Sequence, residues 1–151
     1  MICRKATVKD VAAIVDFQIE MARESEGIEL SIETVRLGVA RVFDDPRWGE
    51  YFVAEKNERV VASTLIQYEW SDWRNAVVWW IHSVYVIPEA RRSGVFRALY
   101  QSIQAEALKR SDVKGFRLYV EKNNVAAQAC YKELGLSSDR YELYEIMLSG
   151  R

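Results

Sequence analysis

Hydrophobic side chains recur along this chain at two spacings, one typical of helices and the other typical of strands. In the first half, apolar positions three or four residues apart predict two helices. The first helix follows Thr7 and Asp10, which fit a capping box, and the second follows Ser31, a suitable N-cap. We expect a first strand over 2–6 and a loop over the glutamate-rich segment 24–30.

The rest of the chain predicts a series of strands and two further helices. Residues 76–87 are the most apolar stretch, and we expect them to form a central strand buried on both faces. The other expected strands are 51–55, 59–68, 115–121 and 141–148, and the expected helices are 92–110 and 124–134. This order predicts a mixed α/β sandwich with a right-handed crossover, built as a single domain over residues 1–151.

Length and charge narrow the range of functions. The 151 residues suit one core, and the formal net charge of −1 gives no global support for binding nucleic acid. The two cysteines, Cys3 and Cys130, are too few for a disulfide framework, so we expect a reducing, cytoplasmic environment. The apolar stretch 76–87 is too short to span a bilayer, and the N-terminal residues lack a signal-peptide pattern, so we expect no membrane partner.

A basic turn between the central strand and the next helix is the sharpest chemical feature. Pro88 closes the strand, Arg91 and Arg92 add two permanent charges, and Gly94 lets a ligand approach the backbone closely. The start of a helix offers unpaired N–H groups and a partial positive charge, which together suit a pyrophosphate. The glycine patterns of the P-loop and of the dinucleotide-binding fold do not occur here. A basic turn that only caps a helix is the alternative interpretation.

Two segments resemble the GNAT superfamily of N-acetyltransferases. Residues 84–100 resemble its acetyl-CoA motif, written Arg/Gln-x-x-Gly-x-Gly/Ala. Arg91 and Gly94 match the first two fixed positions, and Phe96 stands where the family has a small residue. Residues 118–136 resemble the family's block of strand, Asn, helix, Tyr and Leu-Gly-Phe, with leucine in place of the phenylalanine. Two such segments in the right order are a more specific signal than either alone.

The resemblance implies a GNAT-like fold, in which a mixed, mostly antiparallel central sheet is flanked by helices. The strands 76–87 and 115–121 would be parallel and would splay apart, with acetyl-CoA as co-substrate in the gap. The residues that the resemblance places against acetyl-CoA are Val84, Tyr85, Val86, Arg91, Arg92, Ser93, Gly94, Val95, Phe96 and Asn124. Val84 and Val86 would bond the pantetheine arm through their backbone, and Asn124 would bond the pantetheine or cap its helix.

The activity implied by the resemblance is transfer of an acetyl group to a primary amine of a small molecule or peptide, by direct attack in a ternary complex. Tyr131 matches the tyrosine that faces the departing sulfur in this family. His82, the only histidine, lies where many members carry a glutamate and could accept a proton from the amine. A buried core histidine is the alternative, and Glu24 and Glu69 are further candidates for the base.

Other features leave more than one interpretation open. The acidic residues Glu24, Glu26 and Glu29 could recognise a cationic amine or form an ordinary solvated charge run. Trp70 and Trp73 could line an acceptor pocket or a dimer contact, and the resemblance allows a homodimer. One histidine and two distant cysteines form no metal-ligand pattern, so we expect no metal. Besides an enzyme, a non-catalytic acyl-CoA sensor and a protein-interaction domain are compatible with the sequence.

Overall fold

A five-stranded sheet forms the centre of the first of two compact units in this computed structural model, which describes residues 1–148. The first unit spans Met1–Leu118, and the second begins at Tyr119. The strands lie side by side in chain order: β1 (Ile2–Lys5), β2 (Glu50–Lys56), β3 (Arg59–Ser71), β4 (Ala76–Val86) and β5 (Val113–Arg117). The first four strands pair antiparallel, whereas β5 is parallel to β4. The sheet is therefore mixed and mostly antiparallel, which confirms the prediction.

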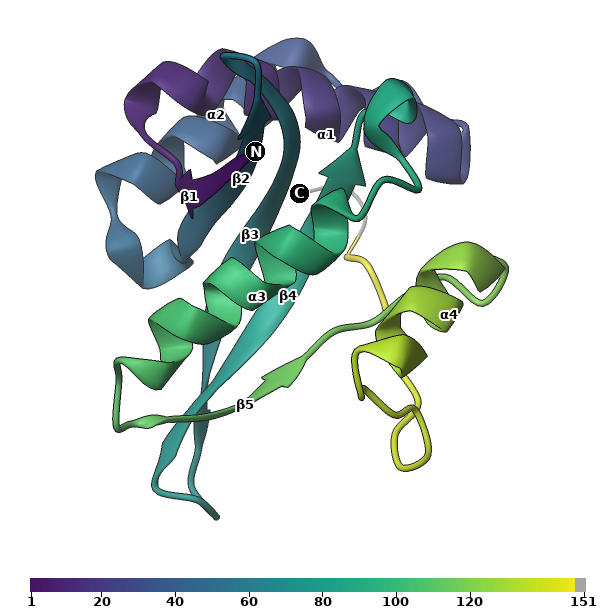
Figure 1. Ribbon diagram of the computed structural model, residues 1–151. Helices are drawn as coiled ribbons and strands as arrows, with labels where there is room; N and C mark the ends of the chain where they lie inside the picture. The colour runs from purple at the N-terminus through teal and green to yellow at the C-terminus, as the bar shows by residue number, and fades with distance from the viewer. Residues whose placement is uncertain (149–151) are drawn as a thin grey trace. The chain divides into compact units, whose positions relative to one another are not determined.

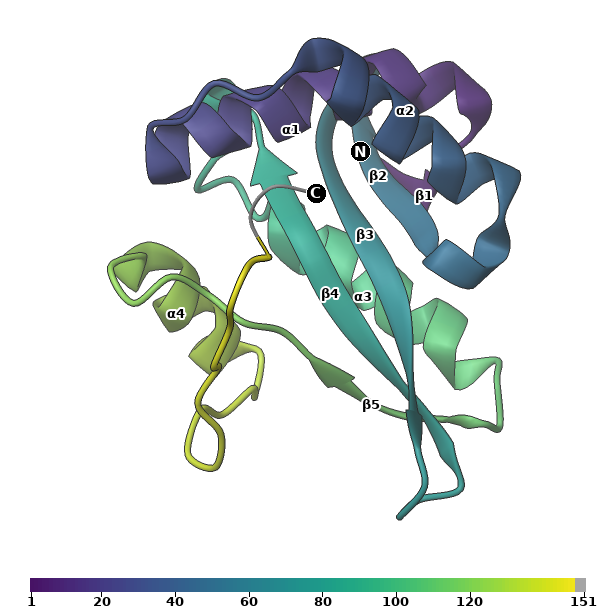
Figure 2. The same cartoon turned by 180° about the vertical axis from the view of Figure 1, so that it is seen from behind.

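Helices cover both faces of this sheet (Figure 1 and Figure 2). One face carries α1 (Val11–Glu26) and α2 (Ile32–Asp44), and the other carries α3 (Val95–Leu108). On the first face, a buried cluster joins side chains of α1 and β2: Ile14, Val15, Ile19, Tyr51 and Val53. On the second face, aromatic rings of α3, β5 and β4 meet edge to face: Tyr100, Phe116 and Trp79. The sheet buries apolar side chains on both sides, and this burial drives the folding of the layers.

Local sequence signals set the ends of the first two helices. The carboxylate of Asp10 accepts the Thr7 N–H at 2.7 Å, as the capping box predicts, and Ser31 caps α2. The loop predicted to begin at Glu24 begins later, because α1 continues through Glu26 and glutamate is a good helix former. Gly27 then ends the helix with a left-handed φ of 65°. Short 3₁₀ turns lie at Val8–Asp10, Pro46–Trp48 and Pro88–Ala90.

The helix predicted over 92–110 begins three residues later, at Val95. Arg92 and Gly94 adopt φ values of 58° and 78°, which belong to the left-handed region and cannot continue a right-handed helix. Residues 92–94 therefore form a turn, and Gly94 becomes the N-cap of α3.

The strands β4 and β5 stay paired over only part of their length. Pairing runs from Val77 with Val113 to Trp80 with Arg117. Within the described chain, the later part of β4, residues 81–86, has no partner from β5, and Figure 1 shows the two strands diverging. The splayed parallel pair is therefore present, and it leaves one edge of β4 open.

The second unit contains α4 (Val125–Glu133). The side-chain oxygen of Asn124 accepts the Ala127 N–H at 3.1 Å and caps this helix, and Gly135 ends it with a φ of 85°. The strand predicted over 141–148 is wrong, because these residues form no strand and their large apolar side chains are exposed. A strand needs a neighbour that supplies hydrogen bonds, and residues 119–148 contain no other strand.

Candidate active site

A bulge lies in β4 where that strand loses its partner β5. Between His82 and Tyr85, β4 carries one residue more than the paired segment of β3. Ser83 takes up the extra length with a φ of 51°, and the Thr64 hydroxyl donates to the His82 carbonyl at 2.7 Å. A bulge shifts the alternation of side chains by one residue, so His82 and Tyr85 face the same side of the sheet.

His82 has the protonation state that a general base requires. Its ring stacks on Trp80, with centroids 5.7 Å apart and planes 8° apart. Partial burial lowers the pKa of His82 below its ordinary value of 6.5, so the ring is neutral at pH 7 and can accept a proton. Glu69, the alternative base on the neighbouring strand, accepts hydrogen bonds from the Trp80 indole and the Arg117 guanidinium. The contact with Arg117 is an ion pair, so the Glu69 carboxylate already has a cationic partner.

Arg91 belongs to a closed cluster at the end of β4. Its Nε donates to the Val86 carbonyl at 2.8 Å, and its Nη2 donates to the Glu24 carboxylate at 2.6 Å. Glu24 also accepts the Tyr85 hydroxyl at 3.0 Å, and the Arg91 guanidinium lies 5.5 Å from the centre of the Tyr85 ring. Burial and the bond to Glu24 raise the pKa of Tyr85 to about 12. The cluster ties the last turn of α1 to the turn that follows β4.

The turn after β4 sets up the start of α3. The left-handed residues Arg92 and Gly94 flank Ser93, whose hydroxyl donates to the Ala90 carbonyl at 2.7 Å. The Ala98 N–H donates to the Gly94 carbonyl at 3.0 Å, which marks the first intrahelical bond. N–H groups before that point lack a partner inside the helix, and the helix dipole adds a partial positive charge. This arrangement, with two arginines beside it, suits a phosphate group.

The backbone of Val86 points toward the open edge of β4. The Ile87 N–H donates to the Val61 carbonyl at 3.0 Å, so Val86 and its partner Ala62 form a pair that exchanges no hydrogen bonds. The N–H and C=O of Val86 therefore point away from β3. Since Arg91 already bonds the Val86 carbonyl, the N–H is the group that this residue can offer to a ligand in the gap.

The residues predicted for the site are divided between the two units. Residues 82–96 lie in the first unit, whereas Asn124 and Tyr131 lie in the second. Phe96, at the third position of the motif, packs against Tyr100 one turn further along α3, with ring centroids 6.2 Å apart. Burial raises the pKa of Tyr131 to about 12, so its phenol is protonated at neutral pH.

The acidic residues at the end of α1 and in the loop after it, Glu24, Glu26 and Glu29, are largely occupied by internal ion pairs. Glu24 bonds Arg91, and Glu29 bonds Arg23 at 2.8 Å. Of the three glutamates, only Glu26 has no ion pair within residues 1–148. Two of the three carboxylates are therefore already paired with arginines, so these residues present less unpaired negative charge to a cationic acceptor than the sequence indicates.

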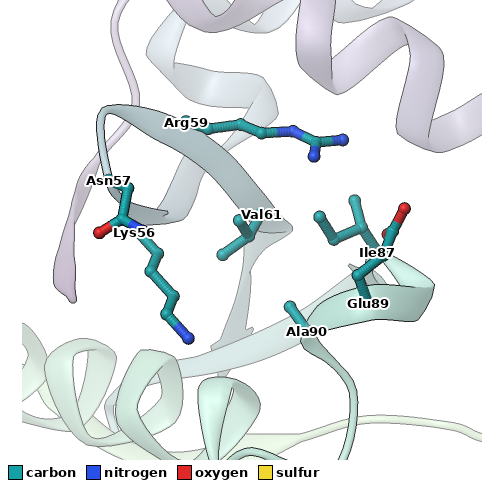
Figure 3. A pocket seen from close by; sticks show the side chains of 7 residues that line it. All are labelled: Lys56, Asn57, Arg59, Val61, Ile87, Glu89 and Ala90. Atoms are coloured by element: carbon teal, nitrogen blue, oxygen red, sulfur yellow. The ribbon is translucent and has the colours of Figure 1, made fainter.

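A solvent-open cavity of about 270 Å³ lies between the β2–β3 hairpin and the turn Pro88–Ala90 (Figure 3). Its lining consists of Lys56, Asn57, Arg59, Val61, Ile87, Glu89 and Ala90. None of the residues predicted to bind acetyl-CoA is among them. Trp70 and Trp73, considered for an acceptor pocket, are 61% and 89% exposed near the tip of the β3–β4 hairpin.

Three contributions to this site escape sequence reasoning. Thr64 appears as an ordinary β-branched strand residue, although its hydroxyl holds the bulge. The left-handed backbone of Ser83 has no signature in the sequence, since serine is not a typical residue for that conformation. Glu24 lies 67 positions before Arg91, so no local spacing could reveal their ion pair.

Comparison with known proteins identifies the family. The chain matches the profile of the Acetyltransferase (GNAT) family over residues 13–136. It is 39% identical to a possible acetyltransferase from Clostridium difficile 630, with a TM-score of 0.89 and coverage of 99% of this chain and 98% of that chain. The structure of a predicted acetyltransferase with acetyl-CoA from Clostridium acetobutylicum is 20% identical, with a TM-score of 0.74 and 95% of each chain covered. A ribosomal-protein-alanine N-acetyltransferase from Brucella melitensis biovar Abortus 2308 is 14% identical, with a TM-score of 0.79 and coverage of 98% and 100%.

The chain therefore belongs to the GNAT acetyltransferase family and is an acyltransferase, which confirms the resemblance seen in the sequence. The similarity to the last two structures, at 20% and 14% identity, shows the fold alone. No curated protein shows significant sequence similarity to the chain. Within residues 1–148, no three potential metal ligands gather in one place, and none of the helices has the length and apolarity to cross a membrane.

Proposed function

We propose that this enzyme transfers the acetyl group of acetyl-CoA to a primary amine of a small molecule or peptide. The observation that carries the proposal is that one unit holds both an open strand edge and a helix start suited to anions. Acetyl-CoA matches both, because its pantetheine arm carries amide groups and its pyrophosphate is an anion. The structure with acetyl-CoA from Clostridium acetobutylicum has the same fold, which supports this choice of co-substrate.

The backbone would do most of the binding. The pyrophosphate would lie against the N–H groups of the turn 93–96, and Val84 and Val86 would face the pantetheine arm from the open edge of β4. An N–H group near the thioester carbonyl would also stabilise the negative charge that develops on its oxygen. A donor of that kind lowers the barrier by about 3 kcal/mol.

The reaction would be a direct attack in a ternary complex. The neutral amine forms a bond to the thioester carbonyl carbon, the C–S bond breaks as the tetrahedral intermediate collapses, and CoA departs as the thiolate. The nitrogen loses its proton to His82, directly or through a water molecule. His82 is neutral at pH 7 because burial lowers its pKa, so it can accept that proton.

Tyr131 would stabilise the leaving group without giving up its proton. Burial raises its pKa to about 12. A thiol has a pKa of about 8.5, so full transfer from Tyr131 to the thiolate would be uphill by about 5 kcal/mol. A hydrogen bond from the phenol to the sulfur is therefore the favoured role, and the thiolate takes its final proton from solvent or from protonated His82.

We further propose that residues 1–151 act as one domain in the cytoplasm. The family profile extends across both units, which supports one functional domain. Within residues 1–148, Cys3 and Cys130 form no disulfide, as a reducing compartment would keep them. Light scattering in solution would determine whether the enzyme also forms a homodimer.

Calorimetry with CoA and acetyl-CoA, followed by an amine panel that measures release of free CoA, tests the proposal. Binding together with amine-dependent release supports it. Binding without release for any amine would favour an acyl-CoA sensor, and absence of binding would reject the proposal.

Replacement of Tyr131 by phenylalanine tests the leaving-group role. We expect Tyr131→Phe to lower kcat about tenfold, because a hydrogen bond to a charged group is lost. Tyr144→Phe in the same unit is the matched control, since Tyr144 is exposed, and it should leave kcat unchanged. Equal kcat for Tyr131→Phe and the parent enzyme would exclude Tyr131 from the reaction.

A further inference from the structure

We infer that the two adjacent arginines of the basic turn have different roles: Arg92 binds the phosphate of CoA, whereas Arg91 is a positioning residue held in place by Glu24. This inference rests on the proposed function, because it assigns roles within the same site. The resemblance to the family places both arginines against acetyl-CoA, and only their contacts in the structure distinguish them.

Arg91 is already committed to protein partners. Its Nε bonds the Val86 carbonyl, its Nη2 bonds Glu24, and its guanidinium lies over the Tyr85 ring. The Tyr85 hydroxyl bonds the second oxygen of the same Glu24 carboxylate, so the three side chains form a closed set of contacts. To reach a phosphate with its whole guanidinium, Arg91 would have to give up all of these contacts at once. The Glu24 carboxylate therefore competes with the phosphate for this arginine.

Arg92 shows the opposite pattern. Its side chain is exposed and forms no hydrogen bond or ion pair with any residue in 1–148. Its backbone has a φ of 58°, a left-handed conformation that is strained for arginine and unstrained for glycine. A strained residue without stabilising contacts points to a functional requirement, which here is a free positive charge next to the N–H groups of α3.

Glu24 holds Arg91 in place and is therefore itself a positioning residue. It lies in the last turn of α1, and its bonds to Arg91 and Tyr85 connect that helix to both the end of β4 and the turn 88–94. The ion pair thus fixes the turn that presents the phosphate-binding N–H groups. Because its carboxylate is used in this way, Glu24 is a positioning residue and not the general base.

The first test compares CoA binding by Arg92→Gln, Arg91→Gln and Glu24→Gln at several NaCl concentrations. We expect Arg92→Gln to weaken binding about tenfold at low salt and to flatten the salt dependence, because a direct charge contact is lost. Arg91→Gln and Glu24→Gln should weaken binding less and keep the slope of the parent enzyme, because they disturb only the position of the turn. Arg92→Lys should restore the salt dependence.

A second test needs no ligand. A double-mutant cycle of Glu24→Gln and Arg91→Gln in thermal unfolding should show coupling, with the double variant no less stable than either single variant. Arg92→Gly should raise the melting temperature because it relieves the strained φ, although it weakens CoA binding. Glu58→Gly is the matched control: Glu58 has a φ of 61° in the β2–β3 turn, so its replacement should raise the melting temperature without changing CoA affinity.

Three results would overturn the inference. Tighter CoA binding by Glu24→Gln would mean that the ion pair had been withholding Arg91 from the phosphate. A larger loss of affinity and slope for Arg91→Gln than for Arg92→Gln would reverse the assignment, and additive stability losses in the cycle would remove the role of Glu24. A parent enzyme that does not bind CoA would instead refute the proposed function, and the cycle would still report whether Glu24 holds Arg91.

Discussion

The hydroxyl of Thr64 bonds the backbone of the β4 bulge, which makes Thr64→Val a sharp perturbation. Valine keeps the shape of threonine and removes only the donor to the His82 carbonyl. The adjacent Ser63 provides the matched control, because its hydroxyl is buried without a hydrogen-bond partner. Thr64 and Ser63 are both fully buried and adjacent in β3, but of the two hydroxyls only that of Thr64 forms a hydrogen bond within the described chain.

The two variants should change stability in opposite directions. In Thr64→Val the His82 carbonyl loses a partner at 2.7 Å in a partly buried place, and we expect a loss of about 1–2 kcal/mol in the free energy of unfolding. For a protein of this length, that corresponds to a drop of roughly 3–6 °C in melting temperature. Ser63→Ala removes an unsatisfied hydroxyl and should be neutral or stabilising by up to about 1 kcal/mol.

Urea unfolding followed by circular dichroism measures both changes, and acetyl transfer assays measure their effect on the site. Because the bulge orients His82 and Tyr85, Thr64→Val should lower kcat in addition to stability, whereas Ser63→Ala should leave kcat unchanged. The reasoning is refuted if Thr64→Val unfolds at the same urea concentration as the parent enzyme, or if Ser63→Ala loses as much stability as Thr64→Val.

Three further predictions concern other parts of the molecule. Gly49→Ala should destabilise the protein by roughly 3 kcal/mol in urea unfolding, because an added Cβ would lie 2.2 Å from the Ile66 carbonyl oxygen at a φ of 127°; a fully stable variant would contradict this. The pH profile of kcat/KM should show a limb below pH 6.5, where His82 gains a proton, and His82→Gln should abolish that limb. If the acidic limb of kcat/KM remains in His82→Gln, the limb belongs to another group. The same lowered pKa of His82 means that the unfolded chain binds the proton more readily than the folded protein, so the free energy of unfolding should also decline as pH falls through 6.5. Asn124→Ala should cost about 1 kcal/mol of stability through loss of the cap on the Ala127 N–H, measured by the melting temperature, and an unchanged value would show that α4 does not need the cap.

Patterns confined to a few neighbouring residues predicted their structures well. The capping box at Thr7 and Asp10, the cap at Ser31 and the helix stops at glycine all depend on groups within one helical turn of each other. The apolar periods placed β4 and the body of α3, because burial of a side chain repeats with the geometry of the element, whereas the predicted start of α3 was three residues too early. The strand predicted over 141–148 did not form. The alternation of apolar and polar residues there is compatible with a strand, but a strand also requires a neighbouring strand to bond, and the local sequence does not show whether one is present.

The sequence by itself determined the family, the order of the helices and strands as far as α4, and the chemical character of the basic turn, since each is written in contiguous residues. Only the tertiary structure decided how the site is held: it paired Arg91 with Glu24 across 67 positions, fixed a left-handed backbone at Arg92 and used Thr64 to hold the bulge beside His82. These features depend on contacts between residues distant along the chain and on backbone conformations that cost energy locally. Such conformations persist because the surrounding packing stabilises them, and no local pattern of residue types encodes that packing.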